Sequence, residues 1–148
     1  MKTSLIMLAL GVSTSIAYAQ KMKNTEVPAL VNTAFQNQYA KVTDVKWEKE
    51  SENFEASFDL NKTDHSVLYN AQGKVLETEV EIELKQLPAG VLEYVKSNYK
   101  GESVEEAAKI TDSKGIVTYE TEVDDKDLIF DSNGKFLKES KESKESKE

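Results

Sequence analysis

Asp64, His65 and Ser66 are the residue types of a hydrolytic triad, and they stand next to one another in the sequence. In such a triad the serine attacks the substrate, the histidine takes its proton and the carboxylate orients the histidine. Adjacent residues of an extended chain point to opposite sides, whereas triad groups must converge from separate elements. His65 is the only histidine and there is no cysteine, so we predict no enzyme activity and assign no catalytic residue.

Metal binding would have to use oxygen ligands, because one histidine cannot supply the three or four nitrogen and sulfur ligands of zinc or copper sites. Calcium accepts carboxylate and carbonyl oxygens. The segment Asp131-Ser132-Asn133-Gly134 resembles the start of a calcium loop, but the twelve-residue run and its closing glutamate are missing. We therefore predict no metal ligand and no cofactor, while weak calcium binding by the many carboxylates stays open.

Acidic residues recur at every second position in several segments. In a β-strand alternate residues share a face, so glutamates at this spacing project from one side at intervals of ~6.7 Å. The candidate partner-binding face comprises the following residues: Glu77, Glu79, Glu81, Glu83, Glu55, Asp59, Glu120 and Glu122. A half-exposed sheet alternates in the same way. Two interpretations follow: a docking surface for a basic partner, and a face kept soluble by its charge.

The overall charge is acidic, with 27 acidic residues, 19 basic residues that are all lysines, and a formal net charge of −8. Nucleic-acid recognition uses basic patches and the bidentate fork of arginine, so we predict no nucleic-acid partner. An acidic protein attracts a basic protein, a basic peptide or a cation.

Residues 1–19 have the pattern of a secretory signal peptide, with Lys2 at the start, a mostly apolar stretch from Leu5 to Ile16, and small residues around a cleavage position after Ala19. The apolar stretch is shorter than the about twenty residues that a membrane span needs. We therefore predict a periplasmic or secreted protein with no membrane insertion after cleavage. Without cysteines, its fold has no disulfides.

An internal repeat organises the rest of the chain. Residues 27–29 (VPA) match residues 87–89 (LPA), and residues 68–76 (LYNAQGKVL) match residues 129–137 (IFDSNGKFL). Between these blocks, Phe54-Glu55 pairs with Tyr119-Glu120. The shared order predicts two copies of one unit.

Each copy opens with a predicted helix whose first position is Pro28 or Pro88, where the missing amide costs nothing. Apolar residues then recur at helical spacing, after which the period changes to two, which indicates about four half-buried antiparallel strands. Trp47 lies two residues after Val45, so both side chains point to the same face of the predicted strand, and we place Trp47 in the core rather than on a partner surface. Ala108 and Ile110 are its expected counterparts in the second copy.

Together, Val27-Pro-Ala, Val45-Lys-Trp-Glu, the turn and strand from Gly73 to Glu79, and the second Leu87-Pro-Ala form an ordered set that resembles the exported PepSY-like, β-lactamase-inhibitor-like proteins of Bacteroidetes. The resemblance covers residues 27 to 137. It implies an α+β fold with a tandem repeat of one helix plus a four-stranded antiparallel sheet, similar to β-lactamase inhibitor protein, and a location outside the cytoplasm. It implies no catalytic residues.

The expected organisation is a signal peptide at 1–19, a lead segment at 20–26, repeats at 27–84 and 85–137, and a disordered Lys-Glu-Ser tail at 138–148, which has no apolar residue. The predicted function is a non-enzymatic binding module for a protein or peptide partner, acting as an inhibitor or regulator. The alternative is an acidic protein that binds cations such as calcium with low affinity.

Overall fold

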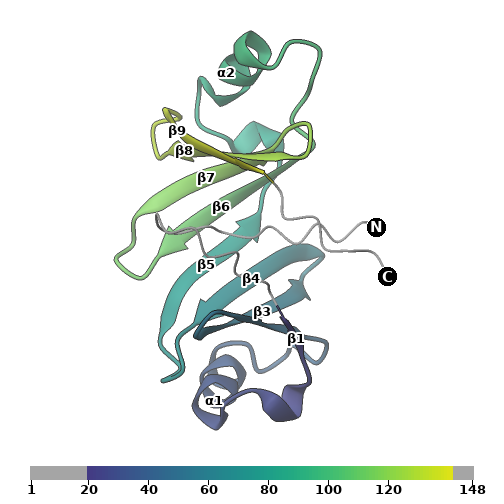
Figure 1. The fold of residues 1–148 in the computed structure, drawn as a ribbon, viewed down its shortest axis with the longest axis vertical. Helices are drawn as coiled ribbons and strands as arrows, with labels where there is room; N and C mark the ends of the chain where they lie inside the picture. Colours follow the sequence, from purple (N-terminus) through teal and green to yellow (C-terminus); the bar gives the residue numbers. More distant parts are fainter. Residues whose placement is uncertain (1–19, 142–148) are drawn as a thin grey trace. The chain divides into compact units, whose positions relative to one another are not determined.

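The computed structural model describes residues 20–141. The predicted signal peptide and residues 142–148 of the predicted tail lie outside the described residues. The chain forms two compact units, each with its own core: an N-terminal unit of residues 20–80 with 111–116, and a C-terminal unit of residues 81–110 with 117–141. Figure 1 shows the helices and strands of both units.

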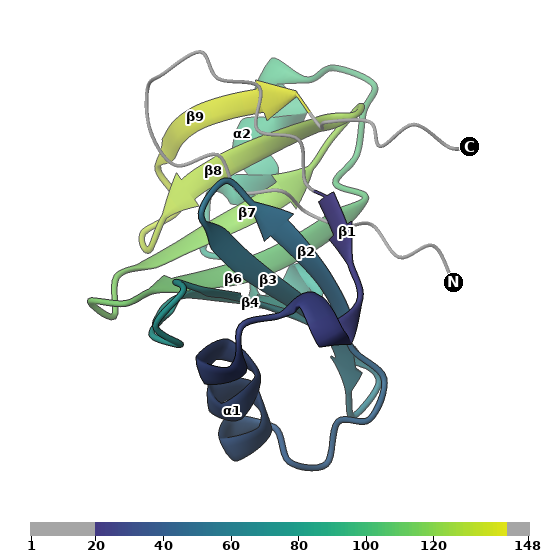
Figure 2. The same ribbon diagram turned by 60° about the horizontal axis from the view of Figure 1, so that its bottom comes forward.

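The N-terminal unit is one α-helix with an antiparallel array of strands in chain order. Its elements are β1 (Gln20–Met22), the 3-10 helix η1 (Asn24–Glu26), α1 (Ala29–Gln38), β2 (Lys46–Glu50), β3 (Asn53–Leu60), β4 (Thr63–Tyr69) and β5 (Val75–Glu81). Residues 20–26, predicted to be a lead segment, instead supply η1 and a fifth strand, because β1 pairs with β2 and places Gln20 opposite Lys49. The α1 helix lies beside these strands (Figure 2).

The core of the N-terminal unit is aromatic and centres on Phe35 of α1, which is fully buried. Its ring lies 5.4 Å from the rings of Tyr39 and Trp47 and 5.2 Å from that of Phe58, measured between centroids. Trp47 is 3% exposed, which confirms its predicted place in the core. Each such burial stabilises the fold by about 1.5–3 kcal/mol relative to an exposed side chain.

The C-terminal unit repeats the pattern with four strands in the order β6-β7-β8-β9. Its elements are η2 (Leu84–Gln86), α2 (Val91–Asn98), β6 (Glu106–Asp112), β7 (Val117–Glu122), β8 (Lys126–Asp131) and β9 (Phe136–Lys141). Strand β9 extends the second repeat beyond its predicted end at residue 137. Residues 138–141 of the predicted disordered tail pair with β8, since backbone pairing needs no apolar side chain.

Two details of the second repeat differ from the prediction. The α2 helix begins at Val91 and not at Pro88, because Gly90 adopts a left-handed φ of 95° that a continuing helix cannot include. The core residue of β6 is Ala107, which packs with Val95 and Phe130. Ala108 and Ile110 are also buried, but Ala108 follows Ala107 directly, and strand alternation places it and Ile110 on the opposite face from Ala107.

The hairpin turns that precede β5 and β9 share one pattern of side-chain-to-backbone hydrogen bonds. The Asn70 Oδ1 accepts hydrogen bonds from the backbone N–H groups of Gln72 and Lys74, both at 3.0 Å. Asp131 does the same for Asn133 and Lys135, at 2.8 and 2.9 Å. These local bonds hold the turn shape that lets the chain reverse.

A glycine in each of these turns packs against the beginning of the helix in the same unit. A Cβ atom on Gly73 would lie 2.6 Å from the carbonyl oxygen of Leu30, and one on Gly134 would lie 2.6 Å from that of Ala89. Both glycines have positive φ, 76° and 82°, which other residues rarely adopt. We call this contact the glycine lock; it joins the last hairpin of each unit to the start of its helix.

Candidate binding face

Within the N-terminal unit, the predicted acidic residues lie on the sheet face away from α1, but most of them are not open to solvent. Glu55 and Glu77 are each 6% exposed, and Glu79 is buried as well. Asp59 is exposed. These residues therefore share one side of the sheet, as strand alternation predicts, but Glu55, Glu77 and Glu79 are buried where solvent exposure was expected.

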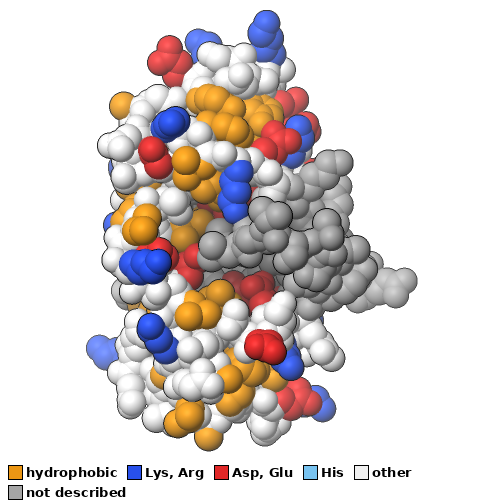
Figure 3. Space-filling model, turned by 60° about the vertical axis from the view of Figure 1, so that its left-hand side comes forward, with side chains coloured by type: hydrophobic (Ala, Val, Ile, Leu, Met, Phe, Trp, Pro, Cys, Tyr) orange, Lys and Arg blue, Asp and Glu red, His pale blue; other side chains and the backbone are white. Residues whose placement is uncertain are grey.

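The predicted residues of the C-terminal unit divide in a similar way. Glu120 is 1% exposed and Glu122 is half-buried, whereas Glu81 and Glu83 are exposed. Glu83 precedes η2 and forms an ion pair of 2.6 Å with Lys85, in which both side chains are largely exposed. In the view of Figure 3, acidic side chains lie scattered among lysine and apolar side chains.

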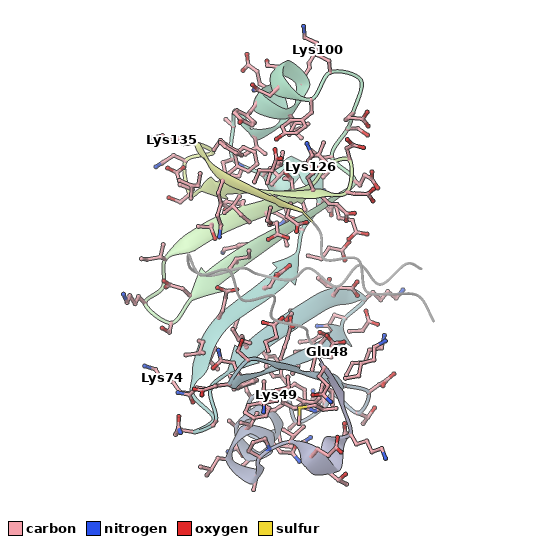
Figure 4. The ribbon with its side chains drawn as sticks, viewed as in Figure 1. Glu48, Lys49, Lys74, Lys100, Lys126 and Lys135 are labelled. Carbon is pink, nitrogen blue, oxygen red and sulfur yellow. The ribbon has the colours of Figure 1, made fainter. Side chains whose placement is uncertain are left out.

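The register of the N-terminal strands brings four carboxylates to one face. Glu48 of β2 lies directly opposite Glu55 of β3, and Leu68 of β4 lies opposite both Glu55 and Glu77 of β5. Glu50 shares the face of Glu48, two residues further along β2, so it lies diagonally across from Glu55. We call Glu48, Glu50, Glu55 and Glu77 the carboxylate cluster. Glu48 is labelled among the strands in Figure 4, whereas Lys74 and Lys135 project outward from the hairpins.

Hydrogen bonds in this cluster leave one oxygen of Glu50 and one oxygen of Glu55 without a donor. The Ser66 hydroxyl donates to Oε1 of Glu55. Among the described residues, no donor reaches Oε2 of Glu55 or Oε1 of Glu50, and both atoms are buried. The two side chains are nevertheless within hydrogen-bonding reach of each other. Two ionised carboxylates have no donor between them, so this contact is a hydrogen bond only when one of them carries a proton.

The electrostatics favour that proton. Burial, followed by the negative charge of Glu50, raises the pKa of Glu55 from 4.5 to about 8, against the lowering effect of the Ser66 hydrogen bond. The pKa of Glu50 is raised by burial as well, and the charges of Glu48 and Glu77 add to this effect. A buried carboxylate loses its hydration, and like charges nearby disfavour ionisation further.

The C-terminal unit places different charges at the equivalent positions. Glu120 of β7 lies opposite Ile129 of β8, which lies opposite Lys138 of β9. This row corresponds to Glu55, Leu68 and Glu77 in the repeat. The second copy thus carries a lysine where the first carries a glutamate.

The Asp64-His65-Ser66 triplet forms no catalytic triad. His65 is half-buried on the core side, where its ring stacks on Phe58 at 5.5 Å with 12° between the planes. Ser66 points to the other face and donates to Glu55. Burial lowers the pKa of His65, so the imidazole is neutral at physiological pH.

Residues 20–141 contain no group of three or more histidine, cysteine, aspartate or glutamate side chains arranged to hold a metal ion. The Asp131 carboxylate, the candidate start of a calcium loop, instead accepts the backbone hydrogen bonds of its turn. None of the helices in this part of the chain has the length and apolar character needed to cross a membrane.

Two residues of the cluster, Glu48 and Glu50, were absent from the predicted face, as was Ser66, which donates to the cluster. A signal for the first two is present in the sequence, because they alternate with Trp47 in the same way that Glu55 alternates with Phe54. Ser66 carries no such signal, since its role depends on the pairing of β3 with β4.

The geometry agrees with the comparisons with known proteins. The family model described as "Putative beta-lactamase-inhibitor-like, PepSY-like" matches the chain twice, at residues 16–77 and 59–138. The chain belongs to this PepSY-like family. None of the curated proteins compared with the PepSY-like chain matches it.

Solved structures similar to this PepSY-like chain come from Bacteroides species. A "putative periplasmic" protein of Bacteroides eggerthii has a TM-score of 0.70 and 15% identity, over 78% of this chain and 88% of that one. A DUF2874 family protein of Bacteroides ovatus has a TM-score of 0.66 and 22% identity, over 81% and 91%. A BLIP-like protein of Bacteroides fragilis has a TM-score of 0.60 and 21% identity, over 80% and 89%. The chain therefore has the α+β, β-lactamase-inhibitor-protein-like fold expected from the sequence, with five strands in the first unit where four were predicted.

Proposed function

We propose that the chain is a periplasmic or secreted binding module that acts on a protein or peptide partner and catalyses no reaction. Membership of a family described as inhibitor-like is the observation that carries this proposal. The likeness of fold to a BLIP-like protein supports it. The signal-peptide pattern of residues 1–19 and the periplasmic description of the Bacteroides eggerthii protein support the location.

The residue inventory is consistent with binding rather than catalysis. Nucleophilic mechanisms draw on a serine or cysteine next to a base, and general acid–base catalysis most often uses histidine. The one histidine of this chain packs against Phe58. The Ser66 hydroxyl donates a hydrogen bond to the buried carboxyl group of Glu55.

Of the eight acidic residues predicted to contact a partner, the exposed ones are the better candidates. A side chain that is less than a tenth exposed offers a partner little surface, which argues against Glu55, Glu77, Glu79 and Glu120 as direct contacts. Asp59 in the N-terminal unit, and Glu81 and Glu83 in the C-terminal unit, are exposed. We assign partner contact to these three, and the net charge of −8 favours a basic partner.

The test is affinity capture from a periplasmic extract of a Bacteroides species, using protein that begins at Gln20. Three immobilised forms are compared: the wild type, Asp59→Asn/Glu81→Gln/Glu83→Gln, and a control, Glu52→Gln/Glu93→Gln/Glu102→Gln, which removes the same charge at other exposed positions. A retained protein is then purified and titrated against all three forms. The proposal expects binding by the wild type and the control and loss in the first variant. No specific binding to the wild type contradicts the proposed function, and equal loss in both variants contradicts the assigned residues.

Cation binding predicts a different result. A protein that binds calcium only when folded melts at a higher temperature in millimolar calcium. The described residues hold no group of three or more histidine, cysteine, aspartate or glutamate side chains placed to bind such an ion. We therefore expect the melting temperature to be the same with calcium and with a chelator; a rise of several degrees would favour the cation-binding alternative.

A further inference from the structure

In the carboxylate cluster of the N-terminal unit, buried carboxyl groups lie beside two oxygens, one of Glu50 and one of Glu55, that no described donor reaches. Glu48, Glu55 and Glu77 are each at most 6% exposed, and they lie in one cross-strand row with Leu68. Burying several ionised carboxylates side by side is costly unless a positive charge or a proton compensates them. The groups near the cluster show which of these is available.

The strand register shows which charged residues lie near the pair. The charged residues that face Glu50 and Glu55 are Glu48 on β2 and Glu77 on β5, with Glu79 on β5 opposite Ser66. From β1, Lys21 lies opposite Glu48, and Lys46 lies at the other end of β2, where it is exposed. The position that holds Lys138 in the C-terminal copy holds Glu77 here, so the N-terminal copy lacks that built-in cation.

The contact between Glu50 and Glu55 supplies the second observation. The two side chains are within hydrogen-bonding reach of each other, Oε1 of Glu50 and Oε2 of Glu55 are buried, and no described donor reaches either oxygen. A single proton placed between them satisfies both oxygens at once and removes one negative charge from the cluster. The Ser66 hydroxyl donates a hydrogen bond to the other carboxyl oxygen of Glu55, Oε1, and this bond fixes the orientation of the carboxyl group.

We propose that Glu50 and Glu55 share one proton, and that its loss at alkaline pH loosens the β2–β3 hairpin and makes the N-terminal unit a pH-sensitive element. Glu50 stands at the end of β2, and Asn53, its cross-strand partner, begins β3. Repulsion between the ionised groups therefore acts close to the turn that joins the two strands, where few ladder hydrogen bonds oppose it. The proposal does not depend on the identity of any partner.

The test is nuclear magnetic resonance of protein labelled with carbon-13 at the glutamate carboxyl groups, titrated from pH 4 to pH 9. We expect one carboxyl to titrate near pH 8, well above the ordinary value of 4.5. Its signal disappears in Glu55→Gln. In Glu50→Gln the same signal titrates at lower pH, because a neutral amide replaces the like charge, while Glu81→Gln, on the exposed end of β5, leaves it unchanged.

Amide hydrogen exchange of β2 and β3 at pH 9 measures the loosening. We expect faster exchange in the wild type than in Glu55→Gln at the same pH, so the chemical rate of exchange cancels in the comparison. Titration of every glutamate near pH 4.5, or a high titration that Glu50→Gln does not move, overturns the shared proton. Equal exchange in the two proteins overturns the switch. Trp47 fluorescence confirms that each variant is folded, because this single tryptophan lies in the N-terminal core.

Discussion

Replacing Gly73 by alanine tests whether the glycine lock holds the N-terminal unit together. The new methyl group would lie 2.6 Å from the carbonyl oxygen of Leu30 and 3.2 Å from the Cβ atom of Ala34, so either the hairpin or the helix has to move. A φ of 76° costs a non-glycine residue about 1–2 kcal/mol. Overpacking in a closed site costs typically about 1–3 kcal/mol more. We expect Gly73→Ala to lower the free energy of unfolding by about 2–5 kcal/mol in total.

Gly115→Ala is the matched control, because this turn glycine has a similar φ of 81° and a Cβ atom added to it would meet no other atom within 4 Å. It bears only the conformational cost of about 1–2 kcal/mol. Urea unfolding followed by Trp47 fluorescence reports directly on the N-terminal core. The reasoning fails if Gly73→Ala destabilises the protein no more than Gly115→Ala does.

Three further substitutions test the core, the buried acid and the turns. Phe35→Ala should lower the free energy of unfolding by about 3–5 kcal/mol in urea denaturation, whereas Leu30→Ala, 62% exposed, should change it by less than about 0.5 kcal/mol; similar effects would contradict the assigned core. The pKa of Glu55 is higher in the folded than in the unfolded state. Its contribution to the free energy of unfolding is therefore complete below pH 4.5 and is lost as pH rises through about 8, by at most about 1.4 kcal/mol per pH unit. Glu55→Gln should flatten this slope in melting curves, and an unchanged slope would refute the assignment. Hydrogen bonds from the backbone, first that of Lys135, lower the pKa of Asp131 below 3.8, so the stabilisation that its carboxylate gives the fold is lost as pH falls through the folded pKa. Asp131→Asn should remove this acid sensitivity while keeping the turn. A melting temperature that falls with pH in parallel with that of the wild type would contradict this role of Asp131.

The repeated motifs in the sequence predict the parts of the fold that depend on interactions between residues close in the chain. Asn70 and Asp131 form hydrogen bonds with backbone groups a few residues further along the chain. The buried side of Trp47 follows from its alternation with adjacent residues. The start of α2 differs from the predicted one because Gly90, two residues after Pro88, adopts a left-handed conformation. Proline permits a helix start but does not enforce one.

The elements that the sequence did not predict depend on pairing across long stretches of chain. Strand β1 has only three residues, and it forms because its backbone pairs with β2, with Gln20 opposite Lys49. Residues 138–141 have no apolar side chain, yet they extend β9 because β8 offers backbone partners.

The candidate site shows the same limit. Alternation predicts Glu55 on the face away from α1, as observed, but it carries no information about what covers that face. The contact of Glu55 with Glu50 depends on the β2–β3 register, and the hydrogen bond from Ser66 depends on the β3–β4 register. Neither register can be read from one strand alone.

The glycine lock also bears on how such a chain arises and diverges. It joins the end of each repeat to its beginning, at Gly73 with Leu30 and at Gly134 with Ala89. A gene segment that encodes one repeat therefore carries its own closing contact, and duplicating the segment duplicates the contact with it. After duplication, the charges on the sheet can diverge, as Glu77 and Lys138 illustrate. The two glycines are not free to drift, because any side chain at either position meets the backbone that leads into the helix.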